Sequence, residues 1–294
     1  MGERISAPGK VFLAGEYAVL EGWPALVVGV DLRIHASVQP ADGVQLIHQP
    51  SGAEWKPPAP PPEQLRFAAR AFTLAGGRDL RLVFEDDFTL GGAKVGLGGS
   101  AGACVLAVRA ARPHASDEEV MRIAAEAHRA EQGGQGSGAD VAACALGGVL
   151  EVRSKPPSLA VRRVRVTGDL RLLLAFTGKS ADTRALIASV RRDSVRMTPI
   201  GLACEDLIRA LERDDRPAAL DCVRRGAVAM EQIGVVTPEL ARIGELAAGA
   251  GAAAKPSGAG GGDCAVIVAF GDAMADRAEA ALRPHFPVFR VSPA

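Results

Sequence analysis

The chain has 294 residues, 48% hydrophobic and 23% charged, which is enough to bury a substantial core and favours two domains over one. Its 34 Lys and Arg residues balance 34 Asp and Glu residues, so nothing favours a nucleic-acid or acidic-membrane partner. We expect no signal peptide and no membrane-spanning helix, because no apolar run is long enough. The five cysteines are odd in number and form no C-x-x-C pair, which predicts a reduced cytoplasmic protein without structural zinc.

The N-terminal half mixes predicted strands and helices. Alternating apolar and β-branched residues predict three strands separated by turns over residues 4–40, and DLRLVFEDDFTL predicts a strand followed by a turn. The run KPPAPPPEQ is too proline-rich for a helix and predicts an exposed extended connection. Helices are predicted over residues 65–77, 100–111 and 116–134, the last with a Ser116–Glu119 capping box.

The segment SKPPS, residues 154–158, predicts a linker, so we expect domains over residues 1–155 and 156–294. Beyond it, strands are predicted over residues 170–177, 264–270 and 288–291, and helices over residues 182–191, 200–213, 217–233 and 238–250. Because strands and helices do not alternate strictly, the predicted fold class is α+β.

Residues 94–102, KVGLGGSAG, form a glycine cluster that leads into an apolar helix. The glycines allow positive φ angles and a close approach to a ligand, and the free N–H groups of a helix that begins at Ser100 favour an anion. The letters also match the weak dinucleotide pattern G-x-G-x-x-A, but they lie mid-chain behind a polar run, and no P-loop Gly-Lys-Ser/Thr follows. A phosphate cradle and a plain helix-entry loop both stay open at this point.

Three further stretches have candidate chemistry. GGQGSGAD places Asp140 at a helix start, where it either caps the helix or lies beside a hydroxyl that must lose its proton. KPSGAGGGDC, residues 255–264, is dense enough in glycine to form an anion-binding nest, the alternative being a flexible hairpin. Lys10 begins an apolar strand, where its ammonium needs an anionic partner unless it reaches solvent.

Together these stretches predict a protein that binds a nucleoside triphosphate and an anionic small substrate and transfers a phosphoryl group. Such transfer depends on positioning and charge neutralisation more than on covalent chemistry. A lysine, an aspartate, backbone amides and Mg²⁺ are sufficient for it.

In this order and spacing, APGKVFLAGEYAVLEG, KVGLGGSAG, GQGSGADVA and KPSGAGGGDC resemble the motifs of the GHMP kinase superfamily, from Ala7 to about Phe270. Within the superfamily they are most similar to the phosphomevalonate kinases. Tyr17 stands where mevalonate kinases usually have histidine, and Lys94 precedes the loop in place of the proline of most relatives. Asp263 stands where mevalonate kinases usually have glycine.

The resemblance implies an N-terminal domain like ribosomal protein S5 domain 2 and a ferredoxin-like C-terminal domain, with ATP and substrate in the cleft between them. The implied reaction transfers a phosphoryl group from ATP, with Mg²⁺, to 5-phosphomevalonate and yields 5-diphosphomevalonate. We expect a cytoplasmic monomer or homodimer that acts on this small molecule and has no nucleic-acid or membrane partner.

The resemblance also implies residue roles. Lys10 and Asp140 are the implied catalytic pair, and they act by electrostatics and positioning because a substrate phosphate is already ionised. The implied ATP-binding residues are Lys94, Gly96, Leu97, Gly98, Gly99, Ser100 and Ala101, and Ser100 is also the implied contact to Mg²⁺. The implied substrate-binding residues are Glu16, Tyr17, Ser137, Gly138, Arg184, Ser257, Gly258, Ala259 and Gly260.

Two positions depart from the family pattern. Gly99 replaces one of the loop's usual paired serines, and Arg129 stands where mevalonate kinases have a magnesium-binding glutamate. The alternative functions are a mevalonate kinase or another GHMP kinase, a GHMP-fold sensor that binds ligand without turnover, and a nicotinamide-dependent dehydrogenase.

Overall fold

A computed structural model describes residues 2–85, 88–90, 93–155, 158–181, 186 and 188–294. The chain divides into two units: unit 1 comprises residues 1–10, 29–88 and 97–147, and unit 2 comprises residues 11–28, 89–96 and 148–294. The strands β1 (Glu3–Ala14) and β2 (Pro24–Pro40) each contribute to both units. The consecutive domains predicted for residues 1–155 and 156–294 stay a prediction.

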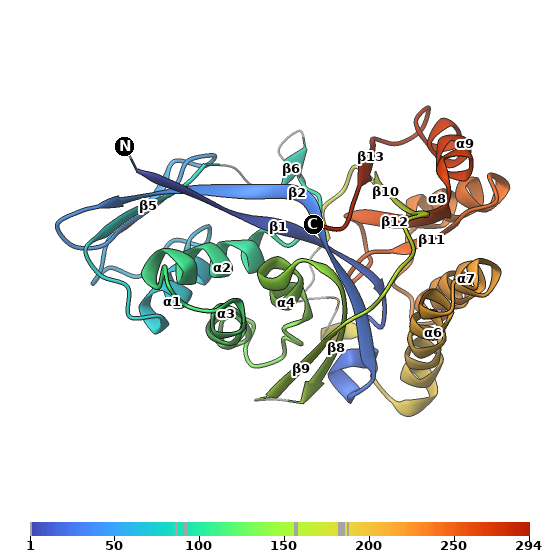
Figure 1. The fold of residues 1–294 in the computed structure, drawn as a ribbon, viewed down its shortest axis with the longest axis horizontal. Helices are drawn as coiled ribbons and strands as arrows, with labels where there is room; N and C mark the ends of the chain where they lie inside the picture. Colours follow the sequence, from blue (N-terminus) through green and yellow to red (C-terminus); the bar gives the residue numbers. More distant parts are fainter. Residues whose placement is uncertain (1, 86–87, 91–92, 156–157, 182–185, 187) are drawn as a thin grey trace. The chain divides into compact units, whose positions relative to one another are not determined.

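Unit 1 has a layer of strands with its helices gathered on one side (Figure 1). Besides parts of β1 and β2, its elements are β3 (Gln45–His48), β4 (Ala53–Trp55), α1 (Arg66–Leu74), β5 (Leu80–Phe84), α2 (Gly99–Ala111), α3 (Asp117–Glu131) and α4 (Ala139–Leu146). The strand order is β4-β3-β5-β2, in which β3 and β5 are parallel and the other two pairs are antiparallel. Helix α2 packs against α1, α3 and α4, so its small and aliphatic side chains are buried.

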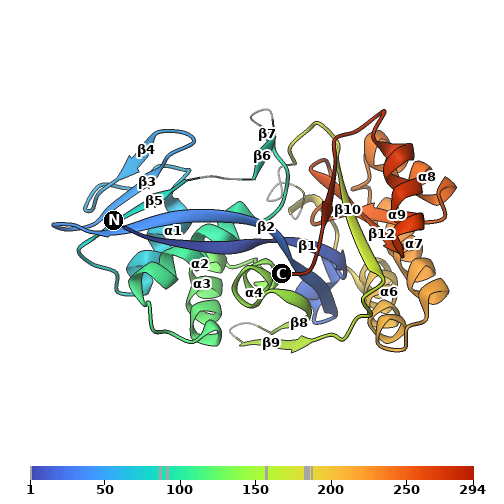
Figure 2. The ribbon, with the colours of Figure 1, turned by 45° about the horizontal axis from the view of Figure 1, so that its top comes forward.

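Unit 2 is built around an antiparallel four-stranded sheet of order β11-β12-β10-β13 (Figure 2). Alternate residues of the sheet, such as Leu173 and Ile267, pack against α8 and α9, and α7 packs against β11 and β12. The strands of unit 2 are β6 (Thr89–Leu90), β7 (Ala93–Lys94), β8 (Gly148–Lys155), β9 (Ser158–Arg163), β10 (Leu170–Phe176), β11 (Ala253–Pro256), β12 (Cys264–Phe270) and β13 (Val288–Val291). Its helices are the 3₁₀ helix η1 (Ala18–Glu21), α6 (Ser194–Glu212), α7 (Arg216–Gln232), α8 (Pro238–Gly249) and α9 (Asp272–Leu282).

Four of the sequence predictions differ from the observed elements. The helix predicted over residues 200–213 begins earlier, at Ser194, and Pro199 lies inside it. Residues 4–40 form two strands rather than three, since β1 continues through Pro8. Within the described part of the chain β1 pairs with β2 alone, and an edge strand tolerates a proline, which has no N–H to donate. The linker predicted at residues 154–158 is wrong, because Lys155 of β8 pairs with Ser158 of β9 in a hairpin. Only one of the two hydrogen bonds of the α3 capping box forms. Ser116 Oγ accepts from Glu119 N, but the Glu119 carboxylate contacts Arg112.

All five cysteines are free thiols and all are buried. Burial raises the pKa of the thiols of Cys104, Cys144, Cys204 and Cys222. Over the residues that the structure describes, no helix combines the length and apolar character needed to cross a membrane.

Candidate functional site

The glycine loop before α2 lies against the side chain of Lys10. Gly98 has a left-handed φ of 85°, and a Cβ atom there would lie 2.6 Å from Lys10 Cγ, so both the conformation and the space require glycine. The backbone N–H of Lys10 donates to Leu97 O at 2.9 Å. The sequence-predicted loop and the sequence-predicted lysine are therefore direct neighbours in unit 1.

The first turn of α2 offers backbone N–H groups rather than side chains. Gly99, Ser100 and Ala101 open the helix, and the N–H groups of a first turn have no partner within the helix. The side chains of Leu97 and Ala101 are buried, so these two residues have only their backbone to offer to a ligand. Together with the helix dipole, this geometry suits the phosphates of a nucleotide.

The hydroxyl of Ser100 belongs to a polar cluster that also contains Asp140. His128, 1% exposed on α3, lies with its Nε2 3.0 Å from Ser100 Oγ and 3.7 Å from Asp140 Oδ2. Asp140 is in the first turn of α4, which begins after Gly138, and Ser137 Oγ accepts from Ala139 N at 3.3 Å. The cluster therefore joins the loop to the second glycine-rich helix start.

Sequence reasoning missed His128. Its only signal is that a histidine falls in the apolar stripe of α3, four residues after Ala124 and eight after Val120. Burial lowers the pKa of this imidazole, and the charges of Lys10 and Arg66 act in the same direction, while Asp140 raises it. The direction of this shift favours the neutral ring.

The cluster fits a magnesium ion that arrives with nucleotide phosphates. Among the described residues, no group of three or more His, Cys, Asp or Glu side chains is placed to hold a metal by itself. Arg129 does not replace the missing glutamate, because its Nε donates to Gly136 O at 2.9 Å. Ser100 and Asp140 supply one hydroxyl and one carboxylate, and Mg²⁺ in such sites takes its other ligands from phosphates and water.

In unit 2, hydrogen bonds of three side chains connect the end of β1 and the turn after it to the loop after β11. Tyr17 donates its hydroxyl hydrogen to Ala259 O at 2.5 Å, and Ser257 Oγ accepts from Phe12 N at 3.1 Å. The Glu16 carboxylate accepts from Gly258 N at 3.2 Å. Burial and the charge of Glu16 raise the pKa of Tyr17 well above its usual range, so this hydroxyl stays a donor.

Glu16 also forms a buried ion pair with Lys255, the first residue of the glycine-rich segment KPSGAGGGDC. The two side chains are 3% and 1% exposed, and Lys255 Nζ also donates to Pro256 O. Glu16 Oε2 is buried and has no hydrogen-bond partner within the described part of the chain. The pair fixes the start of the loop, and a direct contact of Glu16 with substrate stays a prediction.

The rest of the loop packs closely. Gly260 has a φ of 78°, and a Cβ atom there would lie 2.4 Å from Val235 O. A Cβ atom on Gly96 would lie 2.7 Å from Asp263 Cβ, so the start of the first loop contacts the end of this one within unit 2. Asp263 Oδ1 accepts from Ala181 N at 3.0 Å.

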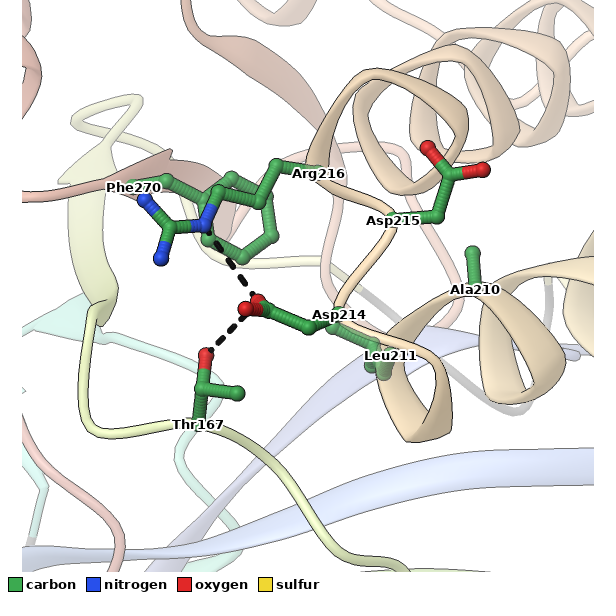
Figure 3. A pocket seen from close by; sticks show the side chains of 7 residues that line it. All are labelled: Thr167, Ala210, Leu211, Asp214, Asp215, Arg216 and Phe270. Carbon is green, nitrogen blue, oxygen red and sulfur yellow. Dashed lines mark hydrogen bonds and ion pairs between the residues drawn. The ribbon is translucent and has the colours of Figure 1, made fainter.

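The positions of two side chains predicted to bind phosphate cannot be given. Arg184 and the side chain of Lys94 lie outside the described part of the chain. A shallow surface depression lies elsewhere in unit 2, where Thr167 and Arg216 converge on the carboxylate of Asp214 (Figure 3). None of the sequence-predicted site residues lines this depression, whose walls are Thr167, Ala210, Leu211, Asp214, Asp215, Arg216 and Phe270.

A glycine loop at a helix start and a buried lysine are the features expected of an anion-binding site in an α+β protein, and the site itself stays a prediction. The chain matches the GHMP kinases N terminal domain over residues 65–148 and the GHMP kinases C terminal domain over residues 207–288. It is 30% identical to the phosphomevalonate kinase of Streptomyces sp. (strain CL190), with 92% of this chain and 90% of that one covered. The chain belongs to the GHMP kinases.

Two further proteins are similar to this chain. The mevalonate kinase of Methanothermobacter thermautotrophicus is 30% identical, with 87% of each chain covered. The solved Streptococcus pneumoniae phosphomevalonate kinase, in complex with phosphomevalonate and AMPPNP, has a TM-score of 0.91 at 19% identity and covers 99% of this chain and 100% of its own. The predicted α+β GHMP kinase fold is thereby confirmed.

Proposed function

We propose that this GHMP kinase transfers the γ-phosphoryl group of ATP to 5-phosphomevalonate and forms 5-diphosphomevalonate. The observation that carries the proposal is the unit 1 cluster, in which close contacts join Lys10 to the glycine loop and Ser100 through His128 to Asp140. The choice of acceptor is supported by the 30% identity to a phosphomevalonate kinase over 92% of the chain.

In this reaction an oxygen of the acceptor phosphate attacks the γ-phosphorus and forms the new P–O bond. The bond to the bridging oxygen breaks, and its electron pair leaves with ADP. The first-turn N–H groups of α2 bind the ATP phosphates, and Lys10 stabilises the negative charge on the transferring phosphoryl group. Asp140 orients the attacking phosphate oxygen. No general base is required, because the acceptor phosphate is already ionised at neutral pH.

Magnesium bound with ATP would neutralise phosphate charge, with Ser100 and Asp140 as the oxygen donors that the cluster offers. The loop residues Ser257, Gly258, Ala259 and Gly260, with Tyr17, Ser137 and Gly138, are the proposed acceptor-binding residues. Lys94 and Arg184 are the proposed partners of the phosphate group of 5-phosphomevalonate, since a bidentate arginine or a lysine point charge suits a phosphate. A cytoplasmic location and a monomeric or dimeric state stay predictions.

The test is an ADP-release assay with ATP and Mg²⁺ that offers mevalonate, 5-phosphomevalonate, homoserine and galactose in parallel. We expect turnover on 5-phosphomevalonate alone, with the Lys10→Met variant as a control for contaminating kinases. Turnover on mevalonate instead would support the alternative to which the Methanothermobacter relative points. ATP binding without turnover on any acceptor would favour a ligand sensor.

A further inference from the structure

The proposed mechanism gives no task to the buried imidazole of His128, which lies between Ser100 and Asp140. Its Nε2 faces the Ser100 hydroxyl at 3.0 Å and the Asp140 carboxylate at 3.7 Å. Its ring packs against Phe67, with 4.8 Å between the ring centroids, so its orientation is fixed. Within the described part of the chain, Nδ1 is buried and has no hydrogen-bond partner. The two ring nitrogens therefore have very different surroundings.

These surroundings determine which nitrogen holds the proton. A carboxylate oxygen only accepts hydrogen bonds, so an unprotonated Nε2 would turn its lone pair toward the negative charge of Asp140. A proton on Nδ1 would leave a buried N–H without an acceptor, which is unfavourable for a neutral ring and for a doubly protonated one. Both arguments favour a single proton on Nε2.

We propose that His128 is a positioning residue that donates Nε2–H to Ser100 Oγ and so frees the Ser100 hydroxyl hydrogen for a phosphate oxygen of the nucleotide. A serine hydroxyl has one hydrogen and two lone pairs. If Nε2 accepted that hydrogen, Ser100 would have none left to give to an anion. The inference deepens the proposed function, on which its ligand rests, by naming the hydroxyl that the phosphate loop uses as a donor.

The binding test uses AMPPNP, titrated calorimetrically against the full chain with and without Mg²⁺. His128→Leu removes the donor that fixes the Ser100 hydroxyl, so the hydroxyl hydrogen is no longer directed at the phosphate, and binding should weaken by up to about tenfold, the value of one hydrogen bond to a charged group. His128→Gln keeps an amide N–H at about the position of Nε2 and should stay within about threefold of wild type. Ile123→Val, which removes a buried methylene from the same helix, is the control for lost packing and should bind normally.

A double-mutant cycle tests whether His128 acts through Ser100. In a Ser100→Ala background, His128→Leu should have almost no further effect on AMPPNP binding. A full tenfold loss in that background, or a His128→Gln variant as weak as His128→Leu, would overturn the proposal. A loss seen only in the presence of Mg²⁺ would also overturn it, because the Ser100 hydroxyl would then act solely through the metal and not as a hydrogen-bond donor to the phosphate.

The tautomer is measured on the wild-type protein without any nucleotide. In protein labelled with ¹⁵N-histidine, protonated and unprotonated ring nitrogens have well separated ¹⁵N shifts, and the spectrum of His128→Gln identifies the His128 signals among five histidines. We expect the proton on Nε2, and a proton on Nδ1 would overturn the inference. Wild-type protein that does not bind AMPPNP would instead contradict the proposed function, while the spectrum would still decide the tautomer.

Discussion

At the scale of single residues, Lys10 and Asp140 are the side chains on which transfer should depend most. We expect Lys10→Met and Asp140→Asn each to lower kcat about 100-fold or more, because preorganised charge in a water-poor site stabilises the transition state. Steady-state kcat with ATP and 5-phosphomevalonate gives the effect, and thermal unfolding shows whether each variant is folded.

The matched control for Asp140→Asn is Asp117→Asn. Asp117 also lies in the first turn of a helix, but it is exposed and pairs with Arg109 away from the cluster. The Asp117→Asn substitution should leave kcat unchanged. Near-normal kcat in a folded Asp140→Asn variant would remove this carboxylate from the mechanism.

Gly99 is the loop position where the resemblance to the family implies a serine. A Cβ atom there meets no heavy atom within 4 Å, so a serine side chain fits without rearrangement. We expect Gly99→Ser to lower the KM for ATP about threefold by adding a hydrogen bond to the phosphates. Gly99→Ala is the control, because it replaces the glycine without adding a hydroxyl. An equal change of the KM for ATP in Gly99→Ala and Gly99→Ser would contradict the expectation.

At the scale of elements, the Glu16–Lys255 pair connects the turn after β1 to β11. Removing one partner leaves a buried charge, so Glu16→Gln or Lys255→Met should each lower the free energy of unfolding by about 3 to 5 kcal/mol. The double variant should lose less than the sum of the two single variants, because no unpaired charge then remains. Urea unfolding of the four proteins measures the cycle.

An exposed ion pair of unit 2 is the control for this cycle. Asp221 and Arg225 pair four residues apart on the surface of α7. Asp221→Asn should change the free energy of unfolding by less than about 0.5 kcal/mol, as is usual for exposed helix pairs. Additive losses in the Glu16 and Lys255 variants would mean that the two charges do not stabilise each other.

Glu239, at the start of α8, should make the free energy of unfolding depend on pH in the acidic range. Its hydrogen bond with Lys179 lowers the pKa of the carboxyl from an ordinary 4.5 to about 2. The folded state then favours the ionised form, so the pair stabilises above pH 4.5, and this contribution is lost as the pH falls toward 2. Wild type should therefore exceed Glu239→Gln in stability at neutral pH, and urea unfolding should show the difference shrinking in this window.

Helices were more predictable from the sequence than strands, because their signals lie within each segment. The α3 helix begins after Ser116 and ends before Gly133, as its end residues indicate. The strand β9 was missed, since its residues are mostly exposed and it is defined by its pairing with β8. Short strands depend on partners that a local pattern does not contain.

The site shows the same division. The glycine loops and the charges set into apolar segments were visible in the sequence, because their composition is unusual at each position. His128 and Lys255 were not identified as site residues, since their partners Ser100 and Glu16 are 28 and 239 residues away along the chain. Contacts between distant residues appear only once the fold brings them together.

At the scale of the whole molecule, unit 2 depends on a segment from the beginning of the chain. Residues 11–28 supply Glu16 to Lys255, the Tyr17 hydroxyl to Ala259, and a Trp23 ring that packs directly against Gly201. We therefore expect residues 156–294, expressed alone, to show no cooperative thermal unfolding by circular dichroism, whereas the full chain should. A cooperative transition in the fragment would show that these contacts are dispensable.

The rate at which each of the five buried thiols reacts with a reagent reports how often its surroundings open. Thiol reagents react with the nucleophilic thiolate, and burial keeps the reagent away from the sulfur, so modification must await a transient opening. Cys104 and Cys144 belong to unit 1, while Cys204, Cys222 and Cys264 belong to unit 2. The order in which a mass spectrometer finds these cysteines labelled would therefore reveal which unit opens first, without any engineered probe.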